Sequence, residues 1–263
     1  MMYHHKSGHI AGKDEFVVVL PDGFDPLLGI WVSKMGPICM NGILYAADDT
    51  TRMTVQSLKD CLAGQRVAVF GAGMIGLLTG LFAKWAGASE VVIVDSIAER
   101  LDTAAKLGLT PLVASVRVPE DIKEKWVAED AMNTGADIVF QCTGSNYLLQ
   151  QAFESLREQG VVIDLGFYQQ GANHVMFGKE FHHNRLRHIC AQIGALPRHQ
   201  QKDWTKLRLS EETIAFMQEH GPLLKEHLVT HVVPLSKGQE IFDALAARDP
   251  SMLQVVLTPE KEQ

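Results

Sequence analysis

Short apolar runs alternate with amphipathic segments from residue 66 onward, and this alternation predicts the centre of the fold. Brief apolar runs bounded by turn residues are typical of buried strands, whereas a 3.6-residue period is typical of helices. The predicted strands cover residues 67–70, 90–94, 137–141, 160–165 and 187–193, and the predicted helices cover residues 74–86, 97–107, 119–133 and 145–157. Regular β–α alternation predicts an α/β fold with a doubly wound parallel sheet.

The two ends of the chain lack this alternation. At the N-terminal end, the pattern predicts a strand over 10–20, a turn at 21–23, a helix over 26–48 and loops over 49–64. At the C-terminal end, it predicts a helix near 209–219, a strand near 227–233, a helix near 236–247 and a strand at 253–257. The sequence contains no internal repeat.

One βαβ unit, residues 66–95 (RVAVFGAGMIGLLTGLFAKWAGASEVVIVD), carries the most informative motif. Gly71, Gly73 and Gly76 follow the first strand with the spacing G-x-G-x-x-G, which permits a tight turn, a close approach of a pyrophosphate and close helix packing. Free N–H groups at a helix start bind phosphates. Asp95 follows about 20 residues later, where a carboxylate can accept hydrogen bonds from ribose hydroxyls. The unit therefore predicts a dinucleotide site, and the charge of Asp95 favours NAD over NADP.

Two other interpretations of this unit are weaker. A glycine-rich turn without a ligand would need only part of the pattern, whereas strand, glycines, helix, second strand and acid all occur here. A transmembrane helix over residues 67–88 is disfavoured by the glycines and by Lys84, and a second apolar run follows directly.

Two later loops follow predicted strands, at the sheet edge where such folds bind ligands. These loops contain Cys142, Thr143 and Gly144 in DIVFQCTGS, and Leu165, Gly166 and Phe167 in GVVIDLGFY. Gly144 and Gly166 would let the backbone pass close to a cofactor. Cys142 has no general base that the sequence identifies, so we interpret it as a buried or loop thiol rather than a nucleophile.

The charge and cysteine content narrow the classes of partner and location. A net charge of −7 without a long basic run argues against nucleic acid or an anionic membrane as a partner. The N-terminus MMYHHKSGH has no apolar core of a secretory signal. The four cysteines are far apart and form no C-x-x-C pair, which is typical of a reduced, cytoplasmic protein.

Eleven histidines raise the question of a metal site. They gather at His4, His5 and His9, at His182, His183 and His188, and at His227 and His231. Residues four apart on a strand lie roughly 13 Å from each other, too far to share one ion. We therefore predict no metal site in this chain.

The sequence resembles a known family, the medium-chain dehydrogenase/reductases, also called the zinc-type alcohol dehydrogenase superfamily. The resemblance extends from about Phe16 to Pro259. It includes VLPDG, GPICMNGIL, GQRVAVFGAGMIGLL, FQCTG, DLGF, FHHNRLRHICAQIGALPR and THVVPLSKGQEIFDAL. The order of these motifs is more specific than the glycine spacing alone.

The resemblance implies a role for each matching position. Gly71, Gly73, Ile75 and Gly76 would line the pyrophosphate; Asp95 would bind the adenosine ribose with Arg100 beside it; Cys142, Thr143 and Gly144 would border the adenosine side; Leu165, Gly166 and Phe167 would lie along the nicotinamide carboxamide. In the family, Lys or Arg near the C-terminus often reaches the pyrophosphate. Gln254 precedes VVLTP here, so we expect weaker cofactor binding.

The chain also departs from the family. Members open with a barrel resembling chaperonin-10 that supplies the catalytic zinc and the proton relay, and here the Cys and the His-Glu pair of that barrel are absent. We expect remnants of this catalytic domain over 1–48 and 201–263, around an NAD-binding domain over 49–200. Zinc is expected in the family but is not predicted here, and the catalytic residues are unknown. A fragment of a longer enzyme and a natural short form both fit.

The resemblance implies hydride transfer between a small alcohol or carbonyl compound and a nicotinamide, with low activity for this chain alone. The alternative is a non-catalytic NAD(H)-binding module or a subunit of a larger complex. Residues 187–195 would form an edge strand, and edge strands pair readily with another chain. We therefore expect a homodimer.

Overall fold

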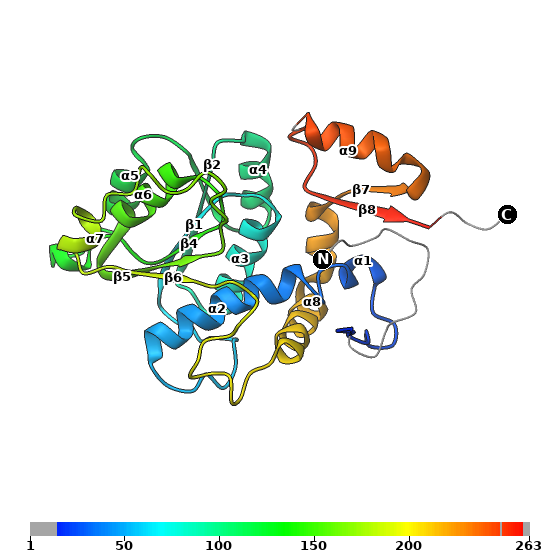
Figure 1. Cartoon of the computed structure of the whole chain (residues 1–263), viewed down its shortest axis with the longest axis horizontal. Helices are drawn as coiled ribbons and strands as arrows, with labels where there is room; N and C mark the ends of the chain where they lie inside the picture. Colours follow the sequence, from blue (N-terminus) through cyan, green and yellow to red (C-terminus); the bar gives the residue numbers. More distant parts are fainter. Residues whose placement is uncertain (1–14, 248, 260–263) are drawn as a thin grey trace.

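Six parallel strands form the centre of the protein, whose computed structural model describes residues 15–247 and 249–259 (Figure 1). They are β1 (Arg66–Phe70), β2 (Glu90–Asp95), β3 (Thr110–Val113), β4 (Ala136–Gln141), β5 (Leu156–Asp164) and β6 (Arg187–Cys190). Their order is β3-β2-β1-β4-β5-β6, so the winding direction reverses between β1 and β4. The predicted doubly wound parallel sheet is confirmed, and the reversal marks the place where such sheets bind ligands.

Helices cover both faces of this sheet because its strands are apolar on both sides. They are α3 (Met74–Trp85), α4 (Ala98–Lys106), α5 (Val118–Lys125), α6 (Asn146–Ser155) and α7 (Glu180–His183), with a 3₁₀ turn η1 (Ala131–Asn133). In β1, Val67 and Val69 pack in the core with α3, whereas Ala68 and Phe70 pack in a second core with α5 and α6. Because side chains alternate along β1, this strand contributes to both cores, one on each face of the sheet.

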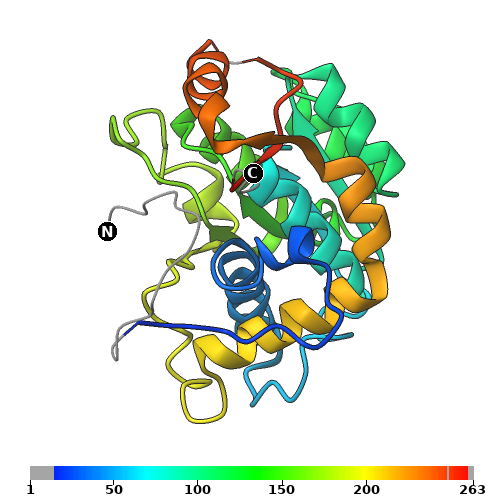
Figure 2. The same cartoon turned by 90° about the vertical axis from the view of Figure 1, so that its right-hand side faces the viewer.

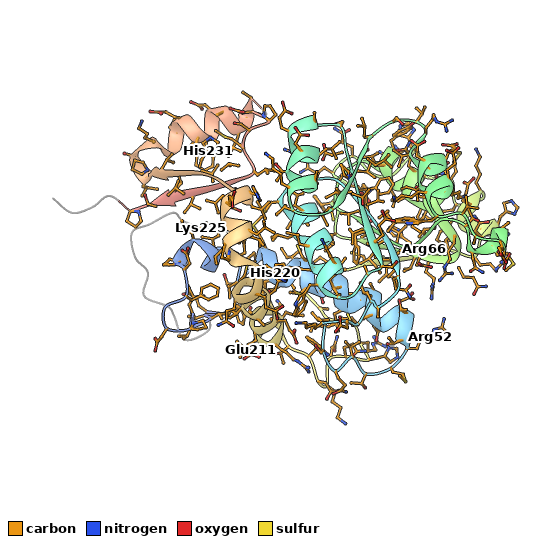
Figure 3. All side chains as sticks on the ribbon, turned by 180° about the vertical axis from the view of Figure 1, so that it is seen from behind. Arg52, Arg66, Glu211, His220, Lys225 and His231 are labelled. Carbon is orange, nitrogen blue, oxygen red and sulfur yellow. The ribbon has the colours of Figure 1, made fainter. Side chains whose placement is uncertain are left out.

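Segments from the two ends of the chain pack against one another on the side of the sheet that α3 covers (Figure 2). They are α1 (Pro26–Gly29), α2 (Met35–Thr51) and α8 (Lys206–Leu228). Phe216 of α8 packs edge-on against Phe82 of α3, with ring centroids 4.7 Å apart. Figure 3 shows Glu211, His220 and Lys225 along α8, away from Arg66 at the sheet.

A small second sheet lies apart from the main sheet and follows α8 directly. It consists of β7 (Val229–Pro234) and β8 (Gln254–Thr258), joined by η2 (Leu235–Lys237) and α9 (Gly238–Ala246). The two strands pair in parallel. The Trp31 indole Nε1 donates to Oε1 of Gln254 at 3.0 Å, so the N-terminal segment is attached to β8.

The N-terminal segment differs from the prediction. Residues 10–14 lie outside the described residues, and residues 15–20 form no strand. The helix predicted over 26–48 is divided into α1 and α2, and α2 continues to Thr51. Pro37 explains the break, because a proline lacks the N–H that a helix interior requires and is tolerated in the first turn.

The remaining differences concern one strand and the ends of three helices. β3 was not predicted, because its four residues include Pro111; proline is tolerated here on an edge strand. The helix predicted over 119–133 ends at Lys125, and the helix predicted to reach 157 ends at Ser155. The helix predicted over 209–219 continues through Pro222 to Leu228, because Leu224 and Leu228 are fully buried. Within the described residues, no helix is long and apolar enough to cross a bilayer.

The amino ends of β1 and β4 are joined by an ion cluster centred on Asp137, at the end of the sheet opposite to the carboxyl ends of the strands. Its carboxylate accepts from Arg66 Nε at 3.0 Å and from Arg157 Nε at 2.5 Å. Burial raises the pKa of Asp137, but the hydrogen bonds from Arg66 and Arg157 outweigh burial, so the pKa lies below its usual value.

We expect Asp137→Asn to destabilise the fold by roughly 2 kcal/mol at pH 7, since it leaves two partly buried arginines unpaired. A depressed carboxyl pKa contributes stability above the unfolded pKa of about 4 and loses it at lower pH. Urea unfolding should therefore show a difference from wild type that shrinks from pH 7 to pH 3. Asp121→Asn, at an exposed helical ion pair, is the control and should change stability by less than about 0.5 kcal/mol.

Candidate functional site

The glycine motif forms a tight turn between β1 and α3 that requires two of its glycines. Gly71 has a φ of 104°, and its N–H donates to the carbonyl of Val94 at 2.7 Å. A Cβ at Gly76 would lie 1.7 Å from the carbonyl oxygen of Gly71. Gly76 thus lets the first turn of α3 pack directly on the turn that leaves β1.

Gly73 differs from its two neighbours because the fold itself does not exclude a side chain there. A Cβ at Gly73 would meet only Nη1 of Arg100, at 4.0 Å. Its φ of −74° and ψ of −178° are open to any residue. Gly73 is also the N-cap of α3, and no side chain caps this helix. The first turn, with Ile75, therefore offers free N–H groups beside open space, which fits a bound phosphate.

Asp95 lies beside this turn at the carboxyl end of β2. One carboxylate oxygen accepts from the N–H of Ala72 at 2.6 Å, and the other accepts from the N–H of Ile97 at 2.9 Å. Nη1 of Arg100 lies 4.0 Å from the first oxygen. Because each carboxylate oxygen can accept two hydrogen bonds, Asp95 keeps acceptor capacity for ribose hydroxyls.

The two predicted loops meet at the carboxyl ends of β4 and β5. A Cβ at Gly166 would lie 2.0 Å from the carbonyl oxygen of Thr143, and a Cβ at Gly144 would lie 2.7 Å from that of Phe167. Leu165 extends toward α2, where its Cδ1 would lie 3.2 Å from a Cβ at Gly42. The structure therefore brings residues 142–144 and 165–167 together, next to Gly71.

Cys142 is a packed thiol. Its Sγ lies 4.0 Å from the hydroxyl of Thr79. Burial, reinforced by the nearby Cys39, raises the pKa of the Cys142 thiol well above its usual value. The thiol thus stays protonated at neutral pH and is a poor nucleophile, in agreement with the interpretation from the sequence.

The histidines do not assemble a metal site within the described residues. Among residues 15–247 and 249–259, no three His, Cys, Asp or Glu side chains are close enough to hold an ion. His227 lies in the last turn of α8 and His231 lies on β7, whereas the rings of His182 and His183 are 5.6 Å apart. His4, His5 and His9 lie outside the described residues. The described side chains do not fit a zinc site, and we derive no chemistry through zinc.

The sequence did not single out two polar residues that support these loops. Gln141 ends β4 and is fully buried; its Oε1 accepts from the N–H and the hydroxyl of Thr143, both at 3.1 Å. Asp164 ends β5 and is 5% exposed. The sequence does show a polar residue at the last position of each apolar run. Such a residue also occurs wherever a strand simply ends, so it does not by itself indicate a supporting role.

The chain belongs to the zinc-binding dehydrogenase family, because residues 75–208 match the model of that family. The chain is 37% identical over 108 residues (41% of this chain, 30% of the relative) to D-xylulose reductase of Saccharomyces cerevisiae. It is 30% identical over 203 residues (75% of this chain, 51% of the relative) to an uncharacterized zinc-type alcohol dehydrogenase-like protein of Escherichia coli. The family that the sequence resembled is thus confirmed.

Solved structures show the same fold. The 2R,3R-butanediol dehydrogenase of Bacillus subtilis has a TM-score of 0.69 at 22% identity, covering 92% of this chain and 60% of that one. An Escherichia coli alcohol dehydrogenase solved with NADH has a TM-score of 0.65 at 17% identity, covering 91% of this chain and 61% of that one. Two curated relatives match about three quarters of this chain, and the matched part spans only about half of each relative's length.

Proposed function

We propose that the chain binds NAD(H) across the carboxyl ends of β1 and β4 and belongs to an oxidoreductase that transfers hydride between a small alcohol or carbonyl compound and the nicotinamide. The open space at Gly73, beside an α3 terminus that no side chain caps, carries this proposal. The packing of the fold requires glycine at Gly71 and Gly76, whereas it leaves open space at Gly73, which fits a ligand bound there.

The proposed binding mode assigns each end of the cofactor to residues already described. The N–H groups of the first α3 turn, including that of Ile75, would bind the pyrophosphate. Asp95 would accept from the adenosine ribose with Arg100 beside it, residues 142–144 would border the adenosine side, and residues 165–167 would flank the nicotinamide. When bound, the nicotinamide supplies the hydride acceptor.

The substrate class follows from the relatives. D-xylulose reductase and sorbitol dehydrogenase 1 of Saccharomyces cerevisiae carry the names of sugars and polyols. We therefore propose a polyol or sugar as the substrate class. All four cysteines are described and free, which is compatible with the reducing cytoplasm that we propose as its location.

Titration of the purified chain with NADH tests the proposal. We expect saturable binding with a micromolar Kd, measured by NADH fluorescence and repeated by calorimetry. ADP-ribose, which lacks the nicotinamide, should compete for the same site. Failure of both ligands to bind at millimolar concentration would refute the proposed function.

A second candidate function is an NAD(H)-binding module without turnover of its own, for instance in a larger complex. The exposure of Phe167, at 77%, favours it, because the nicotinamide end of the proposed site would then lie open to water. Saturable NADH binding combined with no measurable dehydrogenase activity would support this candidate over the first.

We expect Asp95→Asn to reduce the preference for NADH over NADPH. The substitution keeps an oxygen acceptor for a main-chain N–H but removes the negative charge that repels a 2′-phosphate. NADH affinity should fall about tenfold, and the ratio of the two affinities should approach one. Asp102→Asn, an exposed position on α4, is the control. Equal or tighter binding of NADPH by the wild-type chain would contradict the role of Asp95.

We propose that the chain forms a homodimer through β6, which is one of the two edge strands of the sheet. The N–H of Ala191 donates to the carbonyl of Asp164 on β5, so the alternation along a strand directs the N–H of Ile189 to β5 and that of Cys190 to the open edge. Proline at Cys190 would therefore remove an edge donor without breaking the pairing of β5 with β6.

Light scattering should give twice the chain mass of 29.0 kDa for wild type and the single mass for Cys190→Pro. Cys190→Val, which keeps the N–H, is the matched control and should remain dimeric. A monodisperse wild-type monomer at high concentration would contradict the proposed dimer.

A further inference from the structure

Asp164 forms a turn that directs the loop after β5. Its Oδ1 accepts from the N–H of Gly166, two residues on, at 2.8 Å. Such a bond fixes the direction of a loop as it leaves a strand. Since the Asp164 side chain is only 6% exposed, water cannot readily replace this partner.

His188, on the neighbouring strand β6, holds the other oxygen of the same carboxylate. Its Nε2 lies 2.9 Å from Oδ2 of Asp164, and its side chain is 25% exposed. An ionised carboxylate can only accept, so the imidazole nitrogen is the donor. One side chain of β6 therefore determines how the Asp164 carboxylate is oriented toward the loop.

The imidazole of His188 packs against a cluster of aromatic rings. The ring of Phe153 on α6 meets that of His188 edge-on, with centroids 5.4 Å apart. Phe181 on α7 packs against Phe153 at 5.4 Å, and Phe177 packs against Phe181 at 5.0 Å. These contacts hold the His188 ring in the orientation that places Nε2 on Asp164.

On the side away from Asp164, the loop after β5 packs tightly against the loop after β4. Gly166 packs on the carbonyl of Thr143, and Gly144 packs on the carbonyl of Phe167, so the two loops interlock through glycines. The hydrogen bond to Asp164 fixes the direction of the Gly166 N–H. The orientation of this amide thus depends on a chain of contacts that begins at His188.

Tyr168 and Cys142 also lie close to Asp164, and both stay uncharged at neutral pH. Burial, and then the negative charge of Asp164, raises the pKa of Tyr168 well above its usual value. Burial likewise raises the pKa of the Cys142 thiol. Tyr168 thus faces Asp164 as a neutral hydroxyl, whereas His188 lies on the neighbouring strand with Nε2 at 2.9 Å from Oδ2, where it makes a charge-assisted hydrogen bond to the carboxylate.

We propose that Asp164 and His188 are positioning residues that hold residues 165–167 in the conformation that receives the nicotinamide half of NAD(H). This inference rests on the proposed function. It predicts a selective effect: disturbing the pair weakens contacts to the nicotinamide but leaves the adenosine half, bound at α3 and Asp95, unchanged.

The test compares two ligands that differ in the nicotinamide alone. Calorimetry measures the Kd of NADH and of ADP-ribose for wild type, His188→Ala, His188→Gln and Asp164→Asn, with His183→Ala, on the exposed end of α7, as the control. For His188→Ala we expect the Kd of NADH to rise about tenfold and that of ADP-ribose to stay within about twofold. His188→Gln should restore most of the NADH affinity, because the amide can donate to Asp164 in place of the imidazole.

Fluorescence supplies a second readout that a purely structural role would not change. Bound NADH should show weaker emission enhancement in His188→Ala than in wild type at saturation, because its ring is less firmly held. If His188→Ala does not fold, as judged by its melting curve, Asp164→Asn serves in its place and should raise the Kd of NADH about threefold.

The outcomes are distinguishable. An NADH affinity unchanged in both His188→Ala and Asp164→Asn would overturn the inference while leaving the proposed function intact. Parallel loss of NADH and ADP-ribose binding in folded His188→Ala would also overturn it, since the pair would then support the whole site. Failure of the wild-type chain to bind either ligand would refute the proposed function and the inference together.

Discussion

Gly73→Val should abolish NADH binding and leave the chain folded. A valine side chain at this position would occupy the space above the α3 terminus where we place the pyrophosphate. The chain itself tolerates the change, because a Cβ at Gly73 meets only the flexible end of Arg100 at 4.0 Å and the backbone angles suit any residue. We expect a loss of at least about 100-fold in NADH affinity, with a change in stability below about 1 kcal/mol.

Gly76→Ala provides the matched contrast within the same motif. Its Cβ would lie 1.7 Å from the carbonyl oxygen of Gly71, so α3 must shift away from the turn. We expect this variant to lose about 3 kcal/mol of stability. NADH titration and thermal melting of both variants separate the two roles. Retention of NADH binding by a folded Gly73→Val chain would contradict the proposed site.

Local patterns in the sequence were enough to predict the centre of the fold. The apolar runs around Val67 and Val91 are buried on both faces of a parallel sheet, and this requirement leaves a strong signal. The turn from Gly71 to Gly76 is also local, because its geometry depends on a few neighbouring residues. The loops at 142–144 and 165–167 could be found because they follow strands of that sheet.

Features that depend on distant contacts could not be predicted. β3 is short and contains Pro111, and its partner β2 alone makes it a strand. The full length of α8 depends on burial of Leu228 rather than on its own pattern. Asp164 and His188 are 24 residues apart in the chain, and only the pairing of β5 with β6 brings them together. The roles in cofactor binding, the domain division at 48 and 200, and the catalytic-domain remnants remain predictions.

This chain alone should be a poor alcohol dehydrogenase, with a turnover number well below roughly 1 s⁻¹. Hydride leaves an alcohol carbon only as the hydroxyl proton is lost, so the reaction needs a base or a Lewis acid next to the nicotinamide. The side chains near Gly166 serve this purpose badly. Burial raises the pKa of both Cys142 and Tyr168, so neither group accepts a proton from substrate at neutral pH.

Asp164, two residues before Gly166, is engaged with His188. Asp164 accepts from the N–H of Gly166 and contacts His188 on its other oxygen, and its side chain is only 6% exposed, so a substrate has little access to it as a base. Phe167, exposed at 77%, leaves the nicotinamide end of the proposed site open to water, which weakens electrostatic stabilisation of a developing alkoxide. Both observations predict cofactor binding that is much better developed than catalysis.

A steady-state assay with NAD over primary alcohols, secondary alcohols and polyols tests this expectation, with and without added zinc. Slow or absent turnover by a chain that binds NADH would agree with it. Turnover at ordinary enzymatic rates without added metal would show that side chains of this chain supply the base, and His188→Ala would then be the first variant to assay. A rise to such rates on adding zinc would instead indicate that residues outside the described part of the chain complete a metal site, because the described side chains hold no group of three ligands. The two results differ in their response to a chelator, which would abolish only the second activity.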